Sequence, residues 1–307
     1  MKKILICGNS LNQASGLSYV SSSITSRLIE AGYEVGYATI SGAETTSEGA
    51  IVQGERFATI ASGKLALYTA ILNGQNPIEK FNAVIESFSP DIVLAIHDPW
   101  WYDCIAFSSY RSSYTWVAMP TIESPEYPKE VMFHSPLDRS NRKNIFVVLA
   151  TADAIIPCSI MGRDCLRNME LTNVLEPIPH GLDMEDRVSG LTKSVVFDGM
   201  MDDSDFLLMT MGLNTDRKKI ESTLLAFHAF IEKMNYSPKY KLYIHTDTEV
   251  ETGGSDIKGI VRQLNLQEHV LIPNNVMAFS AIPKNELYKR YSVCDAYIGL
   301  PGGEGFG

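Results

Sequence analysis

The sequence lacks paired cysteines, and this absence excludes two kinds of cysteine-based scaffold. Five cysteines occur in 307 residues, widely spaced and without a Cys-x-x-Cys pair: Cys7, Cys104, Cys158, Cys165 and Cys294. Neither a disulfide framework nor a cysteine zinc site is therefore predicted. Because unpaired cysteines are typical of a reducing compartment, we expect a cytoplasmic protein.

Positive charge is also scarce. The 26 lysines and arginines are outnumbered by 36 aspartates and glutamates, which gives a formal net charge of −10. Non-specific binding to nucleic acid or to an anionic membrane requires an excess of cations. We therefore expect no nucleic-acid partner and at most peripheral contact with a membrane.

Long hydrophobic runs are missing as well. The N-terminal segment MKKILICGNS has neither the extended apolar run nor the cleavage site of a signal peptide. The most apolar stretch, 145–162, is short and is interrupted by Asp153 and Pro157. It predicts a buried helix followed by a strand rather than a membrane span, so we expect a soluble protein.

What the chain does contain is a regular alternation of short apolar runs with longer segments of helical period. Residues 3–7 read as a buried strand, 17–31 as an amphipathic helix and 33–40 as a second strand. Further strands are predicted at 91–97, 114–119, 153–158 and 174–178. Because these strands are apolar throughout, the pattern predicts an α/β fold with a parallel sheet covered on both faces. Residues 41–76 fit no clean period and are expected to form an excursion from the sheet.

A second set of alternating elements follows an acid-rich pause at 184–203. We predict an N-terminal domain over 1–183, a connection over 184–203 and a C-terminal domain over 204–307. The elements expected in the second domain are strands at 205–211, 240–246, 269–273 and 295–300 and helices at 217–234, 255–265 and 284–292. Three strands in the chain begin with Asp followed by apolar residues, in the segments PDIVLAI, ADAIIP and CDAYIGL.

The loop Gly8–Gly16 joins the first strand to the first helix. Its glycines would let backbone N–H groups approach an anion or a sugar hydroxyl at the positive end of the helix. The loop is not G-x-G-x-x-G, and no acidic residue closes the second strand, so a dinucleotide-binding dehydrogenase is not indicated. A simple strand-to-helix turn is the alternative.

Arg217 and Lys218 are expected in the first turn of the helix 217–234, capped by Asn214 or Thr215. Cations at a helix N-terminus oppose the helix dipole, which indicates that an anion such as a diphosphate neutralises them. A solvated run of charge is the alternative.

Four glycines surround one carboxylate in the final segment, Pro301–Gly307. Such a backbone can close tightly on a ligand, with Glu304 as its ionisable group. A structural turn, the alternative, would rarely need so many glycines.

Two further features of the sequence have residue types that occur in ligand sites. The D-x-D spacing of Asp203 and Asp205 could hold a divalent cation, but it lies at the start of a strand, so no metal site is predicted. His97 ends the strand 91–97 beside Asp98, where ligands of parallel sheets bind, and it is the candidate site histidine.

Several phrases, in this order, resemble the retaining glycosyltransferases of family four, which have the GT-B fold. The phrases are ADAIIPCSIMG, PIPHGLD (177–183), FLLMTMGLNTDRKKIESTLLAF, LNLQEHVLIP and LYKRYSVCDAYIGLPGGEGFG, with IHDPWWYD (96–103) similar to a loop of the family's first domain. The resemblance implies two Rossmann-like domains that face a cleft. It also implies transfer of a sugar, with retention of configuration, from a nucleotide-diphosphate sugar to an acceptor, which could be a glycan, a lipid, a protein or a small molecule.

Roles for individual residues follow from the same resemblance. Arg217 and Lys218 would hold the donor diphosphate without a metal or other cofactor, and Gly16 would lie near the phosphates or the sugar. Glu304 would contact the donor sugar as a catalytic residue. His97 and Asp98, at the end of the strand 91–97, are the other candidate catalytic residues. The residues that complete the implied donor loop are Gly303, Gly305, Phe306 and Gly307.

The sequence departs from the family in three places. Leu213 stands where the family has an arginine, and Met119-Pro120-Thr121 stands where it has a histidine. The second acid of the family's E-x7-E motif would lie beyond Gly307, so we expect the second domain to be incomplete and to associate as a homodimer through exposed apolar surface. A binding protein that has lost catalysis and a sugar-nucleotide epimerase of the same fold are the alternatives.

Overall fold

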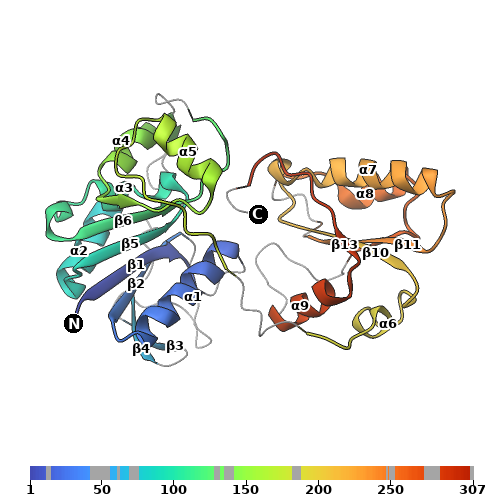
Figure 1. Cartoon of the computed structure of the whole chain (residues 1–307), viewed down its shortest axis with the longest axis horizontal. Helices are drawn as coiled ribbons and strands as arrows, with labels where there is room; N and C mark the ends of the chain where they lie inside the picture. Colours follow the sequence, from blue (N-terminus) through green and yellow to red (C-terminus); the bar gives the residue numbers. More distant parts are fainter. Residues whose placement is uncertain are drawn as a thin grey trace. The chain divides into compact units, whose positions relative to one another are not determined.

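The computed structural model forms two compact units (Figure 1). Unit 1 comprises Met1–His180 and Glu304–Gly307, and unit 2 comprises Gly181–Gly303. The structure describes residues 1–11, 15–41, 56–60, 63–68, 76–127, 132–134, 142–181, 188–246, 248, 253–272 and 284–304.

Unit 1 is built on a seven-stranded sheet in the order β3-β4-β2-β1-β5-β6-β9. Its central strands pair in parallel, as their continuous apolar sequences predict. The strands are β1 (Lys3–Asn9), β2 (Glu34–Ser41), β3 (Arg56–Ile60), β4 (Gly63–Tyr68), β5 (Ile92–His97), β6 (Thr115–Pro120) and β9 (Ala154–Ile155). A separate antiparallel pair is formed by β7 (Met132–His134) and β8 (Arg142–Asn144).

The expectation that 41–76 leaves the sheet is wrong. β4 pairs in parallel with β2, and β3 pairs antiparallel with β4, so this segment supplies one edge of the sheet. An antiparallel edge strand on a parallel sheet needs neither strict alternation nor a continuous apolar run, which is why its sequence has no clear period. The strand predicted at 174–178 is reduced to a single bridge between Ile155 and Val174.

Helices cover both faces of the unit 1 sheet. Ile4 and Ile6 of β1 pack in the cluster that also holds the apolar face of α1, whereas Leu5 and Cys7 face the opposite cluster, which includes side chains of α2, α3, α4 and α5. The helices are α1 (Gly16–Glu30), α2 (Pro77–Phe88), α3 (Asp103–Ala106), α4 (Ile145–Ala150) and α5 (Ile160–Asn168). Successive side chains of β1 are therefore buried on opposite faces, as expected for a central strand with helices on both sides.

Unit 2 repeats this arrangement on a four-stranded parallel sheet in the order β12-β11-β10-β13. Its strands are β10 (Phe206–Met211), β11 (Tyr240–His245), β12 (Val270–Leu271) and β13 (Ala296–Tyr297). Its helices are α6 (Lys193–Val196), α7 (Ile220–Lys233), α8 (Ile257–Gln263) and α9 (Lys284–Val293). α7 and α8 contribute to the core on one face, and α9 contributes to the core on the other. The segment 184–203, expected as a connection, contains α6 and buries Phe197 and Met201 in the second of these cores.

The three strands that begin with Asp share one arrangement of hydrogen bonds. The side chains of Asp91, Asp153 and Asp295 each accept a bond of 2.7 Å from a backbone N–H of the neighbouring parallel strand. The backbone N–H of each aspartate returns a bond of 2.9 Å to the carbonyl of the residue that donated. The donors are Lys3, Trp116 and Leu207, at or near the start of β1, β6 and β10. Each carboxylate thus satisfies an amide at the sheet margin that has no residue of β5, β9 or β13 opposite it.

Candidate functional site

Both sheets change their winding direction at one strand. In unit 1 the chain passes from β1 to β2 on one side and later returns to β5 on the other side of β1. In unit 2 it passes from β10 to β11 and later returns to β13 on the opposite side of β10. Ligands of open α/β sheets bind beyond the carboxyl ends of the strands at such points. Each unit therefore has its own candidate ligand site, which we call the half-site of that unit.

The half-site of unit 1 centres on His97, the last residue of β5. Its side chain is buried, and both ring nitrogens are hydrogen bonded. Nδ1 accepts from the backbone N–H of Asp98 at 2.7 Å, and Nε2 lies 2.5 Å from Oδ1 of Asn9 at the end of β1. Because Nδ1 accepts, the proton of the neutral ring is on Nε2, which donates to Asn9.

Burial lowers the pKa of His97 from its ordinary value to about 3. The imidazole is therefore neutral across the physiological pH range. The indole of Trp101 lies beside it, with ring centroids 5.3 Å apart. Tyr102 fixes the backbone of His97, because its hydroxyl accepts from the His97 N–H at 3.0 Å and lies 2.7 Å from the His97 carbonyl.

The carboxylate of Asp98 is more exposed to solvent than the imidazole of His97. Its side chain is 22% exposed, whereas that of His97 is 4% exposed. The hydroxyl of Thr121, which follows β6, donates to Oδ1 of Asp98. A hydroxyl group therefore contacts this carboxylate in the segment where the family that the sequence resembles has a histidine.

Gly16, predicted as the last residue of the loop, is the first residue of α1. Ser15 caps this helix, because its hydroxyl oxygen accepts from the backbone N–H of Ser18 at 3.1 Å. Among the described residues outside its own helix backbone and chain neighbours, no atom lies within 4 Å of a Cβ placed on Gly16, so these residues do not require glycine here. Three residues of the preceding loop, 12–14, lie outside the described part of the chain.

The half-site of unit 2 brings one of the two predicted cations, Arg217, to the glycine-rich segment. The backbone N–H of Gly302 donates to the carbonyl of Arg217 at 2.7 Å, and Nη1 of Arg217 donates to the carbonyl of Gly303 at 2.6 Å. We call this pair of bonds the Arg217 clasp. It joins the loop after β10 to the loop after β13, on the two sides of the switch point.

The prediction that Arg217 and Lys218 occupy the first turn of a long helix is wrong. They lie in a short 3-10 turn, Asp216–Lys218, and α7 begins only at Ile220. Lys219 separates the two with a φ of +50°, a left-handed conformation that interrupts the helix. The argument for an anion site from the dipole of α7 therefore does not apply, and the Arg217 clasp is the stronger evidence for such a site.

Lys218 lies across Gly212, the residue that follows β10. A Cβ on Gly212 would come within 3.1 Å of Cδ of Lys218 and 3.3 Å of its Cγ. Glycine at 212 thus leaves room for the aliphatic part of the lysine. Neither Asn214 nor Thr215 caps α7.

Asn214 instead joins two loops at the carboxyl edge of the sheet. Its side chain donates to the Ser255 carbonyl at 2.9 Å and accepts from the Ser255 N–H at 3.2 Å. Gly254 packs so closely that a Cβ there would lie 2.2 Å from the Asn214 carbonyl oxygen. The sequence does not predict this role, nor the roles of Asn9 and Thr121, because each depends on a partner 23 to 88 residues away.

Glu304 directly follows the clasp and is partly buried. The remaining residues predicted for the donor loop, Gly305, Phe306 and Gly307, lie outside the described residues.

The D-x-D carboxylates both accept backbone hydrogen bonds. Asp203 accepts from the N–H of Ser194 at 2.8 Å, which lowers the pKa of that carboxyl, and Asp205 accepts from the N–H of Asp202 at 2.9 Å. Among the described residues, no cluster of three or more His, Cys, Asp or Glu side chains could hold a metal ion. Within the same part of the chain, no helix combines the length and apolar character needed to cross a membrane.

No family model and no curated protein matches this chain. Solved structures do match it along almost its whole length. Sucrose-phosphate synthase from Thermosynechococcus elongatus gives a TM-score of 0.68 at 14% identity, over 100% of this chain and 77% of that one. HepE from Anabaena, in complex with UDP and glucose, gives 0.64 at 12% identity, over 98% and 74%. The catalytic domain of starch synthase IV from Arabidopsis thaliana, bound to ADP and acarbose, gives 0.60 at 12% identity, over 97% and 77%.

At such low identities the likeness shows the fold. The chain is a mixed α/β protein with one mainly parallel sheet and one parallel sheet, and it has the GT-B fold of these structures. The fold class predicted from the sequence is therefore confirmed.

Proposed function

We propose that this chain is a glycosyltransferase that takes a sugar from a nucleotide-diphosphate sugar, and that its donor site is the carboxyl edge of the unit 2 sheet. The observation that carries the proposal is the Arg217 clasp, which places a guanidinium beside a glycine-rich backbone at a topological switch point. Two of the structures of the same fold contain UDP or ADP, which is consistent with a diphosphate ligand.

Arg217 and Lys218 would bind the diphosphate. When the bond between the anomeric carbon and the diphosphate oxygen breaks, negative charge develops on the leaving group, and fixed cations stabilise that charge. We propose that these two side chains do so without a metal ion. Both carboxylates of the D-x-D segment accept backbone hydrogen bonds, which gives them a structural role instead.

The sugar of the donor would be held through its hydroxyl groups. Glu304 follows Gly303 directly, so its carboxylate could accept hydrogen bonds from a sugar attached to a diphosphate at Arg217. Gly303, Gly305, Phe306 and Gly307 would complete the loop. We further propose that the sugar is transferred with retention of configuration, as the resemblance to family four implies.

The acceptor would be bound by unit 1, near Asp98. The partly exposed carboxylate of Asp98 is the group there that could accept a proton or a hydrogen bond from an acceptor hydroxyl. His97 is buried, neutral and hydrogen bonded at both nitrogens, so it fits a supporting role better than proton transfer. The acceptor could be a glycan, a lipid, a protein or a small molecule.

A binding protein without catalysis is the second candidate. Leu213 favours it, because this side chain is 40% exposed in the loop where the resembling family carries an arginine. One cationic donor to the diphosphate would then be absent, and ligand binding could persist without turnover.

A thermal-shift screen with UDP-glucose, GDP-mannose and ADP-glucose tests the donor site, since a ligand at 100 times its Kd stabilises a protein by about 2.7 kcal/mol. Release of free sugar from the stabilising donor then separates the two candidates. Binding with release supports a transferase, and binding without release supports the second candidate. If none of the three donors shifts the melting temperature, the proposed donor site is wrong.

A further inference from the structure

A continuous series of hydrogen bonds joins the end of β5 to the start of α1. The Asp98 N–H donates to Nδ1 of His97, and Nε2 of His97 donates to Oδ1 of Asn9. Nδ2 of Asn9 then donates to the hydroxyl oxygen of Ser15 at 3.1 Å, and this oxygen also accepts from the Ser18 N–H. The series connects Asp98 to the residue that caps the helix beginning at Gly16.

Asn9, like His97, accepts a hydrogen bond on one side of the series and donates one on the other. Its amide oxygen meets the protonated nitrogen of His97, and its amide nitrogen meets a hydroxyl oxygen, which matches the two ends of a carboxamide. Asn9 is 6% exposed and His97 is 3% exposed, so water has little access to replace either contact.

The backbone at both ends of this contact is held separately. The hydroxyl of Tyr37 donates to the Asn9 carbonyl at 2.6 Å, and the hydroxyl of Tyr102 contacts both backbone groups of His97. A change of the Asn9 side chain should therefore alter the ring of His97 while the strands remain in place.

We propose that Asn9 is a positioning residue that, together with the Asp98 N–H, holds His97 as its Nε2–H tautomer and thereby keeps Asp98 in register with the N-terminus of α1. The inference rests on the proposed function in that Asp98 is taken as a ligand-contacting residue of unit 1. With the tautomer fixed, Nδ1 of His97 stays available to accept from the Asp98 N–H. Without Asn9, the ring can turn or change its tautomer, and the turn that carries Asp98 loses this support.

The first measurement uses the nitrogen signals of the His97 ring in the full-length protein. In the wild type we expect a neutral Nε2–H ring that does not titrate between pH 5 and 8. In Asn9→Asp, a carboxylate beside Nε2 favours the charged ring, so His97 should begin to titrate in this range. In Asn9→Ala, the ring should no longer be held in one tautomer.

The matched control is Asn173→Ala. Asn173 is another partly buried amide of unit 1, and its Nδ2 donates to the Ala152 carbonyl at 2.6 Å. This substitution should lower the melting temperature but leave the His97 signals unchanged. Asn9→Asp is nearly isosteric, so it keeps the test decisive if Asn9→Ala does not fold.

The second measurement separates donor binding from turnover. The probe reaction is release of glucose from UDP-glucose. If ADP-glucose or GDP-mannose gives the larger thermal shift, release of its sugar is measured instead. Because a displacement of about 1 Å at a reacting group can lower rates about 100-fold, we expect Asn9→Ala to lower kcat by about 10- to 100-fold. The KM for the donor should change less than about twofold, since the diphosphate is bound in unit 2. Asn173→Ala should leave both constants unchanged.

Unchanged His97 signals in both Asn9 variants would overturn the inference, as would a wild-type kcat in a variant whose His97 ring is altered. If no donor binds to the wild-type protein, the proposed function fails instead. The ring signals then still decide whether Asn9 sets the His97 tautomer.

Discussion

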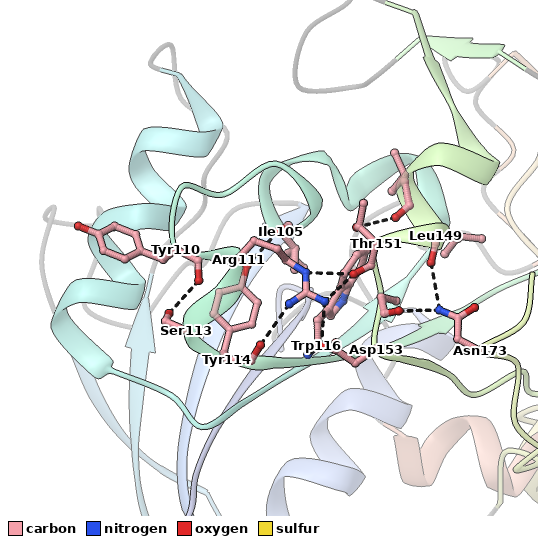
Figure 2. A network of polar contacts seen from close by, with 12 residues as sticks. Ile105, Tyr110, Arg111, Ser113, Tyr114, Trp116, Leu149, Thr151, Asp153 and Asn173 are labelled. Atoms are coloured by element: carbon pink, nitrogen blue, oxygen red, sulfur yellow. Dashed lines mark hydrogen bonds and ion pairs between the residues drawn. The ribbon is translucent and has the colours of Figure 1, made fainter.

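Arg111 should contribute more to the stability of unit 1 than any surface ion pair. Its guanidinium donates to the Thr151 carbonyl from Nε at 3.1 Å and from Nη2 at 2.5 Å, and to the Tyr114 carbonyl from Nη1 at 3.1 Å (Figure 2). It also pairs with the carboxylate of Asp153 at 2.8 Å and lies over the ring of Trp116. One side chain thus joins the segment before β6 to the segment between α4 and β9.

The magnitude follows from the acceptors that Arg111→Ala would leave behind. A hydrogen bond from a charged donor contributes about 1.5–3 kcal/mol, and two backbone carbonyls depend on this guanidinium. The ion pair adds less than about 1 kcal/mol, because the Asp153 side chain is 49% exposed. We expect Arg111→Ala to lower the free energy of unfolding of unit 1 by about 3–6 kcal/mol.

Arg111→Lys separates geometry from charge. An ammonium group keeps the charge and can still pair with Asp153, but it cannot reach both carbonyls at once. We expect it to recover at most about 1 kcal/mol of the loss. Arg163→Ala is the matched control, since this arginine pairs at 2.8–2.9 Å with Asp164 and Glu176, whose side chains are 55% and 71% exposed. It should cost less than about 1 kcal/mol.

Urea unfolding followed by tryptophan fluorescence is the appropriate assay. All three tryptophans of the chain, Trp100, Trp101 and Trp116, belong to unit 1, so the signal reports this unit alone. A loss below about 1 kcal/mol in Arg111→Ala would refute the reasoning. Full recovery in Arg111→Lys would show that charge, rather than the geometry of the guanidinium, holds these segments together.

Three further predictions concern the half-sites. Arg217→Ala should weaken the binding of a bare nucleoside diphosphate, measured by calorimetry, about 10- to 100-fold. Glu304→Gln should leave this binding unchanged and impair only recognition or transfer of the sugar nucleotide. Equal losses of nucleoside-diphosphate affinity in the two variants would contradict this division of roles. Asp203→Asn combined with Asp205→Asn, or added EDTA, should leave nucleotide binding unchanged, and a loss under either treatment would show that a metal takes part. Burial lowers the pKa of His97 in the folded state to about 3, so the unfolded chain binds the proton more tightly, and the stability contributed by the neutral ring is complete above its ordinary pKa and is lost as the pH falls. Lowering the pH from 7 to 5 should therefore reduce the stability of unit 1 by roughly 2 kcal/mol in urea unfolding. His97→Asn cannot titrate and should show a correspondingly flatter dependence on pH.

Periodicity and composition predict most of the fold because the central strands are buried on both faces. The runs that became β1 and β5 are apolar throughout, and only a parallel sheet between two layers of helices buries such strands completely. The edge formed by β3 and β4 could not be predicted in the same way. An edge strand is covered less, so its sequence is under weaker constraint.

The candidate site was predictable in its residue types but not in its geometry. Cations and glycines that follow strands of one sheet must meet at the same edge, so the proximity of Arg217 to Gly302 and Gly303 follows from strand order. The left-handed conformation of Lys219 does not, since lysine has no preference for it and helical periodicity continues through the residue. The contact between Asn9 and His97 spans 88 residues and depends on the pairing of β1 with β5.

The aspartates that precede β5, β9 and β13 also determine strand alignment. Parallel strands are joined by long crossovers, so no tight turn dictates which residues face each other, unlike in a hairpin. A carboxylate that reaches one particular amide supplies this missing information, since sliding the strand by two residues would preserve the apolar face but break both reciprocal bonds. A single residue type, repeated in both units, thus excludes misaligned sheets that burial of apolar surface alone would tolerate.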